Sequence, residues 1–401
     1  MTRIAVVGIG ADGWPGLGEA ARATILAADE VIGSQAQLAL LPAHGIRSTR
    51  AWPTPIDPLL DELAARTTGT TCVLAAGDPM LHGIGATLAR RLGPGAFVVH
   101  PHVSAFALAC ARLHWPSADV ELVSTVGRAP DAVAGVLQPG RRVVVYAGGE
   151  DGAARVARML RTRGYGPSRF VVFERLGAAD ERVVDLTAQV WGGRWAEPRH
   201  AIAIECRPAH GTPLLQRTPG LPDAAYAGDG QPTTRPIRAL TLAALQPMPG
   251  QLLWDVGAAN GSIAIEWLRA EPSARAIAIE ARADRAKQAA TNALQLGVPE
   301  LEVRTGRAPA ALDGLPPPDA VFVGGGLDAP GLVAACWVAL RPRGRIVANA
   351  VTLEGEQALI AARAVHGGQL ARIEVANAQP LGTLTGWRPQ APVVQWTVAK
   401  P

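Results

Sequence analysis

The sequence predicts an α/β protein, because strand-like apolar runs alternate with amphipathic helical segments along nearly all of its 401 residues. That length exceeds what one typical core supports, so two or three domains are expected. Apolar residues make up 48% of the chain, which is enough to bury large cores. Small-residue turns follow several of the apolar runs, and the carboxyl ends of strands are where open α/β sheets bind ligands.

Composition excludes several classes of protein. The formal net charge of +4 is carried almost wholly by arginine without a dense basic run, so nucleic-acid binding is not expected. No signal-peptide layout precedes the first strand and no apolar run approaches the ~20 residues of a membrane span, so a soluble cytoplasmic protein without membrane contact is expected. The cysteines lie far apart in apolar contexts without C-x-x-C spacing, which predicts buried thiols in a reducing cytosol: Cys72, Cys110, Cys206 and Cys336.

The opening RIAVVGIGADG predicts a strand and a glycine turn that matches G-x-G-x-x-G at Gly8, Gly10 and Gly13. A dinucleotide site also needs a second strand that ends in an acid. Here Asp29 and Glu30 precede the next short strand, VIGS, instead of following it. The dinucleotide interpretation is therefore disfavoured.

Two more strand–turn–helix units follow in the first half. TTCVLAAGDPMLHGIGATLARRL predicts a buried strand, a turn at Gly77, Asp78 and Pro79, and a helix. FVVHPHVSAFALACARL predicts the same order, with Ser104 as a helix N-cap. Asp78 can be a ligand contact, or only a turn or N-cap residue. Further strands are predicted at VELVS, RRVVVYAGG, SRFVVFERL and HAIAIEC.

The motifs VVGIGADG, LAAGDPMLHGIGATLA, PHVSAFALACARLHWP and PSRFVVFERLGAADERV resemble the tetrapyrrole methylase family, closest to its branch that methylates precorrin in cobalamin biosynthesis. The resemblance implies two α/β lobes with S-adenosylmethionine (SAM) in the cleft between them. The sequence departs from the family's frequent proline at Ala11 and from its frequent Arg-His pair near Ala36 and Gln37. The cofactor contacts implied in this half lie at its turns and strand ends: Ala11, Ala76, Gly77, Asp78, Leu81, Ser104, Ala105 and Ala147.

Residues 209–235 are predicted to form a linker, because prolines and glycines at short intervals forbid a long helix or strand. The expected domains are therefore residues 1–208 and 236–401. The segment TTRPIRALTLAALQP, at the start of the second domain, predicts an amphipathic helix that lies like a lid before the first strand.

Residues 251–282 predict a nucleotide-binding βαβ unit, in which LLWDV and AIAIE are the strands and SIAIEWLRA is the helix. Gly257 and Gly261 let the backbone turn tightly and approach a ligand. Glu280, about 20 residues on at a strand end, is placed to accept both hydroxyls of a ribose. The turn D-V-G-A-A-N-G has Ala259 where a dinucleotide fingerprint has glycine, and Asp255 before the turn suits a cationic, phosphate-free ligand.

This turn resembles motif I of the class I SAM methyltransferases, and an ordinary packing turn is the alternative. Later segments predict five more strands, LEVRTG, DAVFVGGG, GRIVANA and a closing pair at LARIEVANA and PVVQWTV, with helices between them. Seven strands with an antiparallel final pair match the Rossmann-like sheet of a class I SAM methyltransferase domain.

TTRPIRALTL, LLWDVGAANGSIAIEW, the acid of AIAIEAR, DAVFVGGG and ANAVTLE together resemble the decarboxylating precorrin methyltransferases. Asp255 either orients the turn amides and faces the amino-acid end of SAM, or is a structural acid that anchors the turn. The cofactor contacts that the resemblance implies are Thr234, Gly257, Ala258, Ala259, Asn260, Gly261, Glu280 and Ala308.

The two resemblances together imply methylation of precorrin-6Y at carbons 5 and 15, with one SAM site per domain and loss of carbon dioxide from the ring C acetate, giving precorrin-8. No metal is needed, because a protonated pyrrolenine of the substrate is an electron sink, and no cluster with ligand spacing is visible. Arginines suit a polycarboxylate ring, and Arg235, Arg307 and Arg388 are candidates, with ordinary surface arginines as the alternative. Arg388 is expected in a late loop, GTLTGWRPQAP.

Candidates for proton handling are weaker. His82 and His102 lie near the cofactor turns of the first half, while Asn349 and Glu354 flank the strand end ANAVTLE. Three alternatives stay open: a dinucleotide-dependent oxidoreductase, a nucleic-acid methyltransferase, and a SAM-dependent enzyme acting on another tetrapyrrole with only one half active. A homo-oligomer is expected.

Overall fold

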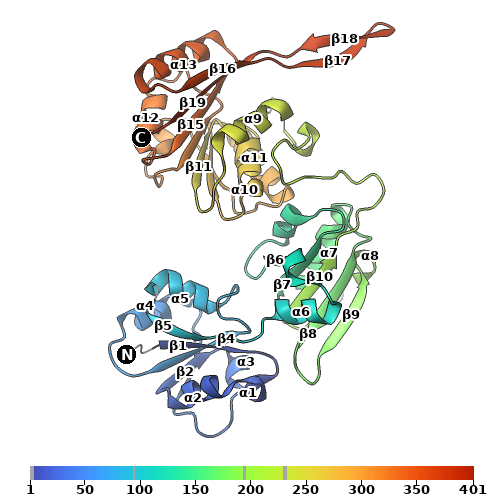
Figure 1. The fold of residues 1–401 in the computed structure, drawn as a ribbon, viewed down its shortest axis with the longest axis vertical. Helices are drawn as coiled ribbons and strands as arrows, with labels where there is room; N and C mark the ends of the chain where they lie inside the picture. Colours follow the sequence, from blue (N-terminus) through green and yellow to red (C-terminus); the bar gives the residue numbers. More distant parts are fainter. Residues whose placement is uncertain (1–3, 94, 193–195, 229–232) are drawn as a thin grey trace. The chain divides into compact units, whose positions relative to one another are not determined.

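The computed structural model describes residues 4–93, 95–192, 196–228 and 233–401, and the chain divides into two compact units (Figure 1). The first unit comprises Met1–Pro130 and Pro139–Thr212, and the second comprises Asp131–Gln138 and Pro213–Pro401. Both are α/β, which confirms the predicted fold class.

The first lobe of the first unit is a parallel sheet in the order β3-β2-β4-β1-β5. Apolar side chains cover both faces of this sheet, with Val6 and Val73 in one cluster and Val7 and Leu74 in the other. The strands are β1 (Ile4–Ile9), β2 (Glu30–Gly33), β3 (Thr49–Ala51), β4 (Thr71–Ala76) and β5 (Phe97–His100). The helices are α1 (Gly13–Gly16), α2 (Glu19–Ala27), α3 (Gln35–Leu38), α4 (Asp57–Ala65) and α5 (Ile84–Leu92).

The second lobe is a mixed sheet in the order β6-β7-β10-β8-β9, in which only β6 and β7 run parallel. Its strands are β6 (Val120–Ser124), β7 (Arg142–Gly148), β8 (Arg169–Glu174), β9 (Arg182–Thr187) and β10 (Arg199–Glu205). Its helices are α6 (Ala105–Leu113), η1 (Ser117–Asp119), α7 (Gly152–Thr162) and α8 (Ala188–Trp191). The sequence predicts four of these strands and misses β9, an edge strand whose side chains are mostly exposed.

The second unit is built on a sheet of seven strands in the order β13-β12-β11-β14-β15-β19-β16. Only β19 pairs antiparallel with its neighbours, which confirms the predicted antiparallel closing pair. The strands are β11 (Leu252–Val256), β12 (Arg275–Glu280), β13 (Glu302–Thr305), β14 (Ala320–Val323), β15 (Arg345–Ala350), β16 (Gln369–Ile373) and β19 (Val393–Ala399).

Helices cover both faces of this sheet, and successive residues of β11 alternate between the two cores, Leu253 in one and Trp254 in the other. The helices are α9 (Arg235–Leu245), α10 (Ser262–Ala270), α11 (Ala283–Gln295), α12 (Leu332–Ala339) and α13 (Leu353–His366). Short 3₁₀ turns are η2 (Pro130–Val136), η3 (Asp223–Ala225) and η4 (Ala310–Leu312). Gly135 of η2 meets Gly297 backbone to backbone, so that a side chain at either position would collide.

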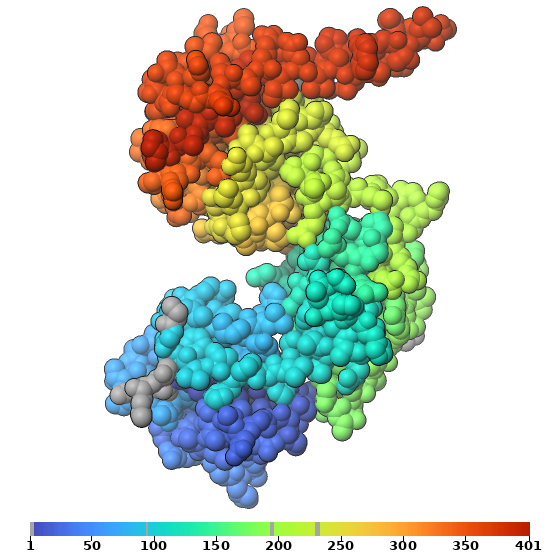
Figure 2. All heavy atoms as spheres, viewed as in Figure 1, coloured from blue at the N-terminus to red at the C-terminus, as the bar shows by residue number. Residues whose placement is uncertain are grey.

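The segment GTLTGWRPQAP, expected as a loop around Arg388, is instead part of a β-hairpin. It pairs β17 (Ala376–Leu381) with β18 (Leu384–Pro389), and Arg388 lies on β18 opposite Asn377. Figure 2 shows the hairpin standing clear of the rest of the second unit. The loop prediction is therefore wrong, because glycine and proline are tolerated in a solvent-exposed two-stranded ribbon.

Much of the segment expected as a linker packs on the second unit. Leu221 and Tyr226 are buried in the same core cluster as Leu242 of α9 and Trp267 of α10. The prolines and glycines of the segment forbid long regular elements, and they still allow this packing.

Candidate functional site

Three turns meet at the carboxyl edge of the first sheet. A Cβ at Gly8, near the end of β1, would collide with the carbonyl oxygen of Gly77 and lie 2.9 Å from the backbone nitrogen of His102. Gly77 has a φ of +58°, and a Cβ there would lie 3.3 Å from the Cα of Ser104. The structure thus brings together the turns that carry Ala11, the GDP sequence and Ser104, as the sequence predicts from strand order.

The polar residues of these turns have local partners. Oδ1 of Asp78 accepts a hydrogen bond from the backbone N–H of Met80 at 2.8 Å, so Asp78 does close its turn. Ser104 caps α6, and its hydroxyl accepts from the N–H of Ala107 at 3.1 Å. These bonds fit the structural alternative for Asp78 and leave its second oxygen without a bond in the described residues.

The remaining first-unit candidates surround these turns. Ala76 is exposed at the end of β4, Leu81 is half-buried, Ala105 begins α6 and Ala147 is buried in β7. His82, with a left-handed φ of +55°, meets the ring of Tyr146 edge-on at 6.2 Å. Burial and the nearby charge of Arg128 lower the pKa of His82, which disfavours its imidazolium form.

The glycine turn of the second unit follows β11 in left-handed backbone. Gly257, Ala259 and Gly261 have φ values of +73°, +50° and +80°. A Cβ at Gly257 would lie 2.7 Å from the backbone nitrogen of Gly325, so only glycine fits there. Ala258 and Asn260 are buried between these positions.

Glu280 fixes the same turn from the end of β12. Its carboxylate accepts from the N–H of Ala259 at 2.8 Å and from the N–H of Arg282 at 2.9 Å. A carboxylate has about four lone-pair directions, so two backbone bonds leave capacity for ribose hydroxyls. The N–H of Gly306 bonds the carbonyl of Glu280 at 2.9 Å, which places the turn that carries Arg307 and Ala308 beside this strand end.

Asp255 lies beneath the turn and is 1% exposed. Its Oδ2 accepts from the N–H of Ala264 at 3.0 Å, which ties β11 to α10. Its buried Oδ1 has no hydrogen-bond partner among the described residues. Burial raises the pKa of Asp255 to about 7, and the charge of Glu280 acts in the same direction. A cationic ligand would stabilise the ionised form of Asp255 that the fold itself disfavours.

Asn349 belongs to a closed amide and hydroxyl cluster. Its Nδ2 donates to Oγ1 of Thr241 at 2.9 Å, and Nε2 of Gln395 donates to its Oδ1 at 2.9 Å. Gln395 also donates to Oγ1 of Thr241 at 3.2 Å. Asn349 therefore joins α9 to the sheet, which weakens a direct catalytic role.

The other second-unit candidates lie on the surface or at helix ends. Thr234 is the N-cap position of α9, and its hydroxyl donates to Oε1 of Gln390 at 3.2 Å. Arg307 and Glu354 are exposed, as are Arg235 at the start of α9 and Arg388 on β18. Because the three arginines are exposed, each can bind a carboxylate of a ligand that arrives from solvent.

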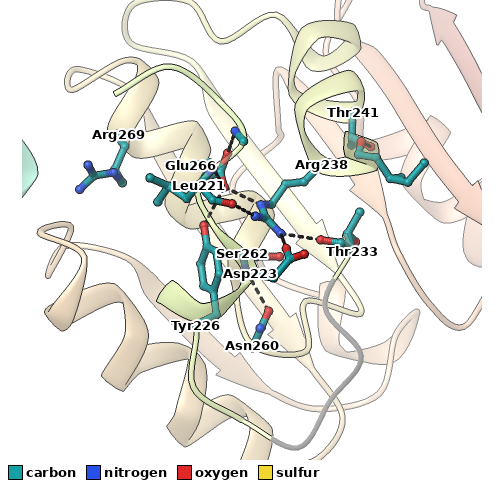
Figure 3. Close-up of polar contacts among 12 residues, drawn as sticks. Leu221, Asp223, Tyr226, Thr233, Arg238, Thr241, Asn260, Ser262, Glu266 and Arg269 are labelled. Carbon is teal, nitrogen blue, oxygen red and sulfur yellow. Dashed lines mark hydrogen bonds and ion pairs between the residues drawn. The ribbon is translucent and has the colours of Figure 1, made fainter. Parts of the chain in front are cut away.

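Sequence reasoning missed a buried ion pair beside this site (Figure 3). Arg238 of α9 is fully buried, and its Nε donates to Oε1 of Glu266 of α10 at 2.5 Å. Glu266 also accepts from the N–H groups of Gly220 and Leu221, at 2.5 and 3.0 Å, and from the hydroxyl of Tyr226 at 2.8 Å. A charged residue on the apolar face of each helix is the signal that could have found this pair.

Arg238 and the side-chain amide of Asn292 hydrogen-bond the chain before and after residues 229–232. Nη1 of Arg238 donates to the carbonyl of Thr233 at 2.5 Å and to Asp223 at 3.0 Å. Nδ2 of Asn292, on α11, donates at 3.0 Å to the carbonyl of Ala227 and at 3.0 Å to the carbonyl of Asn260. The segment predicted as a linker is thereby joined to the glycine turn through the side-chain amide of Asn292.

The described residues hold neither a candidate metal cluster nor a candidate membrane-spanning helix. No group of three or more His, Cys, Asp and Glu side chains there is placed to hold a metal ion. None of the helices there is both long and apolar enough to cross a membrane.

Family models match both halves of the chain. A model described as tetrapyrrole (corrin/porphyrin) methylases matches residues 3–190, and one described as a precorrin methyltransferase domain matches residues 224–400. These matches agree with the resemblances found in the motifs of each half.

Curated relatives resemble either the whole chain or a part of it. The precorrin-6Y C(5,15)-methyltransferase [decarboxylating] of a Sinorhizobium species is 42% identical over 99% of this chain and 96% of its own length. A cobalt-precorrin-7 C(5)-methyltransferase of Salmonella typhimurium is 33% identical over 45% of this chain and 88% of its own length. A probable cobalt-precorrin-6B C(15)-methyltransferase (decarboxylating) of Pyrobaculum calidifontis is 34% identical over 42% of this chain and 89% of its own length.

Proposed function

The chain belongs to the family of decarboxylating precorrin-6Y C(5,15)-methyltransferases, and from that membership we propose that it carries out both methylations itself. The substrate is precorrin-6Y, which is methylated at carbons 5 and 15 and loses carbon dioxide from its ring C acetate to give precorrin-8. Two SAM molecules are consumed per substrate, one in each unit.

The observation that carries this proposal is the glycine turn of the second unit. Gly257 lets the turn pass close to the backbone of Gly325, where a Cβ would collide, and the buried Oδ1 of Asp255 has no partner among the described residues. Glu280 has remaining acceptor capacity at the adjoining strand end. A cationic ligand with a ribose and no phosphate, such as SAM, fits this set of groups.

The contacts that would hold SAM follow from the motifs and from the turns that the structure brings together. In the second unit they are Thr234, Asp255, Gly257, Ala258, Ala259, Asn260, Gly261, Glu280 and Ala308. In the first unit they are Ala11, Ala76, Gly77, Asp78, Leu81, Ser104, Ala105 and Ala147.

We assign carbon 5 to the first unit and carbon 15, with the decarboxylation, to the second. The motifs of the second half resemble decarboxylating precorrin methyltransferases, and of the two part-length relatives described above the one named for carbon 15 is named as decarboxylating. A separate relative is named for carbon 5 alone, and its match extends over less than half of this chain.

When bound, SAM supplies an electrophilic methyl group from its sulfonium. The chain's contribution is to hold the donor and a meso carbon of the substrate in line and close together, which is where most of the acceleration of such a displacement comes from. Arg235, Arg307 and Arg388 are the proposed partners of the substrate's carboxylates. His82 and His102 are the proposed proton-handling side chains of the first unit, and Asn349 is a weaker candidate in the second.

We also propose that the protein is a homo-oligomer. The hairpin of β17 and β18 exposes Leu381, Leu384 and Trp387, whose exposed fractions are 70%, 74% and 78%. Apolar side chains gathered on one projecting ribbon favour a protein partner. Light scattering coupled to gel filtration measures the mass directly, and a monomer at micromolar concentration would contradict this proposal.

The function is tested by incubating the full chain with precorrin-6Y and SAM that carries deuterated methyl groups. Mass spectrometry of the product is expected to show two labelled methyl groups and the loss of one carbon dioxide. A product with a single methyl group would mean that one unit is silent, and an unmodified substrate would refute the proposal.

A further inference from the structure

Asp12 and His102 form a carboxylate–imidazole pair in the first unit. Asp12 lies in the turn after β1, and His102 lies in the turn between β5 and α6. Nε2 of His102 is 3.2 Å from Oδ1 of Asp12. The imidazole side chain is 13% exposed and the carboxylate 35% exposed, so the pair lies at the border between protein and solvent.

Glycines make the space for this pair. A Cβ at Gly10 would lie 2.5 Å from Oδ1 of Asp12 and 2.7 Å from Nε2 of His102. A Cβ at Gly16, at the end of α1, would collide with the same carboxylate. Any larger residue at either position would displace the pair, so Gly10 and Gly16 allow these two side chains to approach each other.

The pair adjoins the turns assigned to the cofactor. Asp12 directly follows Ala11, and His102 is two positions before Ser104. The backbone nitrogen of His102 would be 2.9 Å from a Cβ at Gly8, which would also collide with the carbonyl oxygen of Gly77. A tetrapyrrole that presents a carbon to the methyl donor at this edge therefore comes near the imidazole.

The first unit's reaction requires a proton acceptor. Methyl transfer forms a carbon–carbon bond at meso carbon 5 and breaks the carbon–sulfur bond of the donor, which leaves as the neutral thioether. Carbon 5 then carries both the new methyl group and its original hydrogen, and the ring system holds a positive charge. Loss of that hydrogen as a proton restores the conjugation, so one proton is released for each methyl group added.

We propose that the His102 imidazole accepts this proton and that Asp12 is the residue that positions it, an inference that rests on the proposed methylation of carbon 5. Asp12 accepts the Nε2–H hydrogen bond, which leaves the lone pair on Nδ1. Nδ1 has no hydrogen-bond partner in the described residues. After the transfer the carboxylate stabilises the imidazolium, and the proton passes from Nδ1 to solvent.

Within the described part of the first unit, the other histidines near these turns lack a carboxylate partner. Nε2 of His100 is 3.0 Å from the hydroxyl of Thr24, which carries no charge to stabilise an imidazolium. Burial, together with the neighbouring charge of Arg128, lowers the pKa of His82 and opposes its protonation. Among the histidines that the structure describes, only His102 combines a carboxylate partner with a place among the proposed cofactor turns.

The test follows each methylation separately in the full chain, so that carbon 15 serves as an internal reference. His102→Ala and Asp12→Asn are each expected to slow methylation of carbon 5 by about 10²-fold or more, the usual contribution of general base catalysis. SAM affinity and methylation of carbon 15 stay at wild-type levels. Added imidazole restores the rate at carbon 5 in His102→Ala and has no such effect in Asp12→Asn, where His102 still fills the site.

His100→Gln is the matched control, because it removes a nearby imidazole outside this pair, and it is expected to leave the rate at carbon 5 unchanged. Wild-type rates at carbon 5 in both test variants would overturn the inference. So would a loss of SAM affinity as large as the loss of rate, because the pair would then only hold the turn. If the wild-type protein adds no methyl group at carbon 5, the proposed function fails instead.

Discussion

The buried ion pair between Arg238 and Glu266 predicts a large and local loss of stability when one partner is neutralised. Glu266→Gln keeps the shape of the side chain and removes the charge that faces a fully buried guanidinium. Oε1 of Glu266 accepts from Arg238, Leu221 and Tyr226, and Oε2 accepts from Gly220. The amide of Gln turns an N–H₂ group toward at least one of these donors.

Breaking a buried pair by removing one partner costs about 3–5 kcal/mol, because the other charge stays buried. In Glu266→Gln the guanidinium keeps the half-exposed Asp223, at 3.0 Å, as its remaining charged partner among the described residues. For a domain of this size, about 2–4 °C of melting temperature is lost per kcal/mol, so the transition of the second unit should fall by about 6–20 °C. Burial raises the pKa of Tyr226 well above its ordinary value, so its hydroxyl stays a donor throughout the neutral range and cannot relieve the loss by ionising.

Differential scanning calorimetry of the full chain measures this effect, with Glu374→Gln as the control. Glu374 pairs with Arg372 at 3.1 Å on the surface of the same unit, and exposed pairs contribute about 0–1 kcal/mol. A shift for Glu266→Gln no larger than that of the control would refute the reasoning. The first unit's transition should stay in place in both variants.

Three further predictions concern single groups. Because burial raises the pKa of Asp255 from 3.8 to about 7, its contribution to stability is present below about pH 4 and is lost as the pH rises to about 7. Urea titrations over that range should show this fall in wild type and not in Asp255→Asn, and an equal fall in both would contradict the assignment. The four cysteines are buried thiols, and burial raises the pKa of Cys72 and of Cys336 to about 12. A thiol reagent at neutral pH should therefore label the cysteines only after unfolding, and rapid labelling of the native chain would contradict this. Asn292→Leu should weaken SAM binding in the second unit about tenfold or more, because it removes the side-chain amide that holds the glycine turn at Asn260. Thr291→Ala, at an exposed position on the same helix, should leave SAM binding unchanged. Equal SAM affinities of the two variants by calorimetry would contradict this.

The alternation of strands and glycine turns could be predicted from the sequence because each signal is local. An apolar run such as LLWDV and the glycine that must follow it are read within a few residues of one another. Parallel strands then bring their ends to one edge, so the meeting of the turns near Gly77 and Ser104 follows without further information.

Contacts between distant segments could not be predicted in this way. Arg238 and Glu266 lie 28 positions apart, and Asp12 and His102 lie 90 positions apart. No periodicity links such residues, because their meeting depends on how whole elements pack. The hairpin of β17 and β18 was missed for another reason: its strands are exposed on both faces, so they lack the alternation that marks a half-buried strand.

The most direct test of the account is the number of SAM molecules that one chain binds, measured by isothermal titration calorimetry. Two sites per chain are predicted. Gly257→Val and Gly77→Val should each leave a single site, because both glycines have left-handed φ values and their Cβ positions approach backbone atoms at 2.7 and 3.3 Å. One site in the wild-type chain would contradict the claim that each unit binds its own methyl donor.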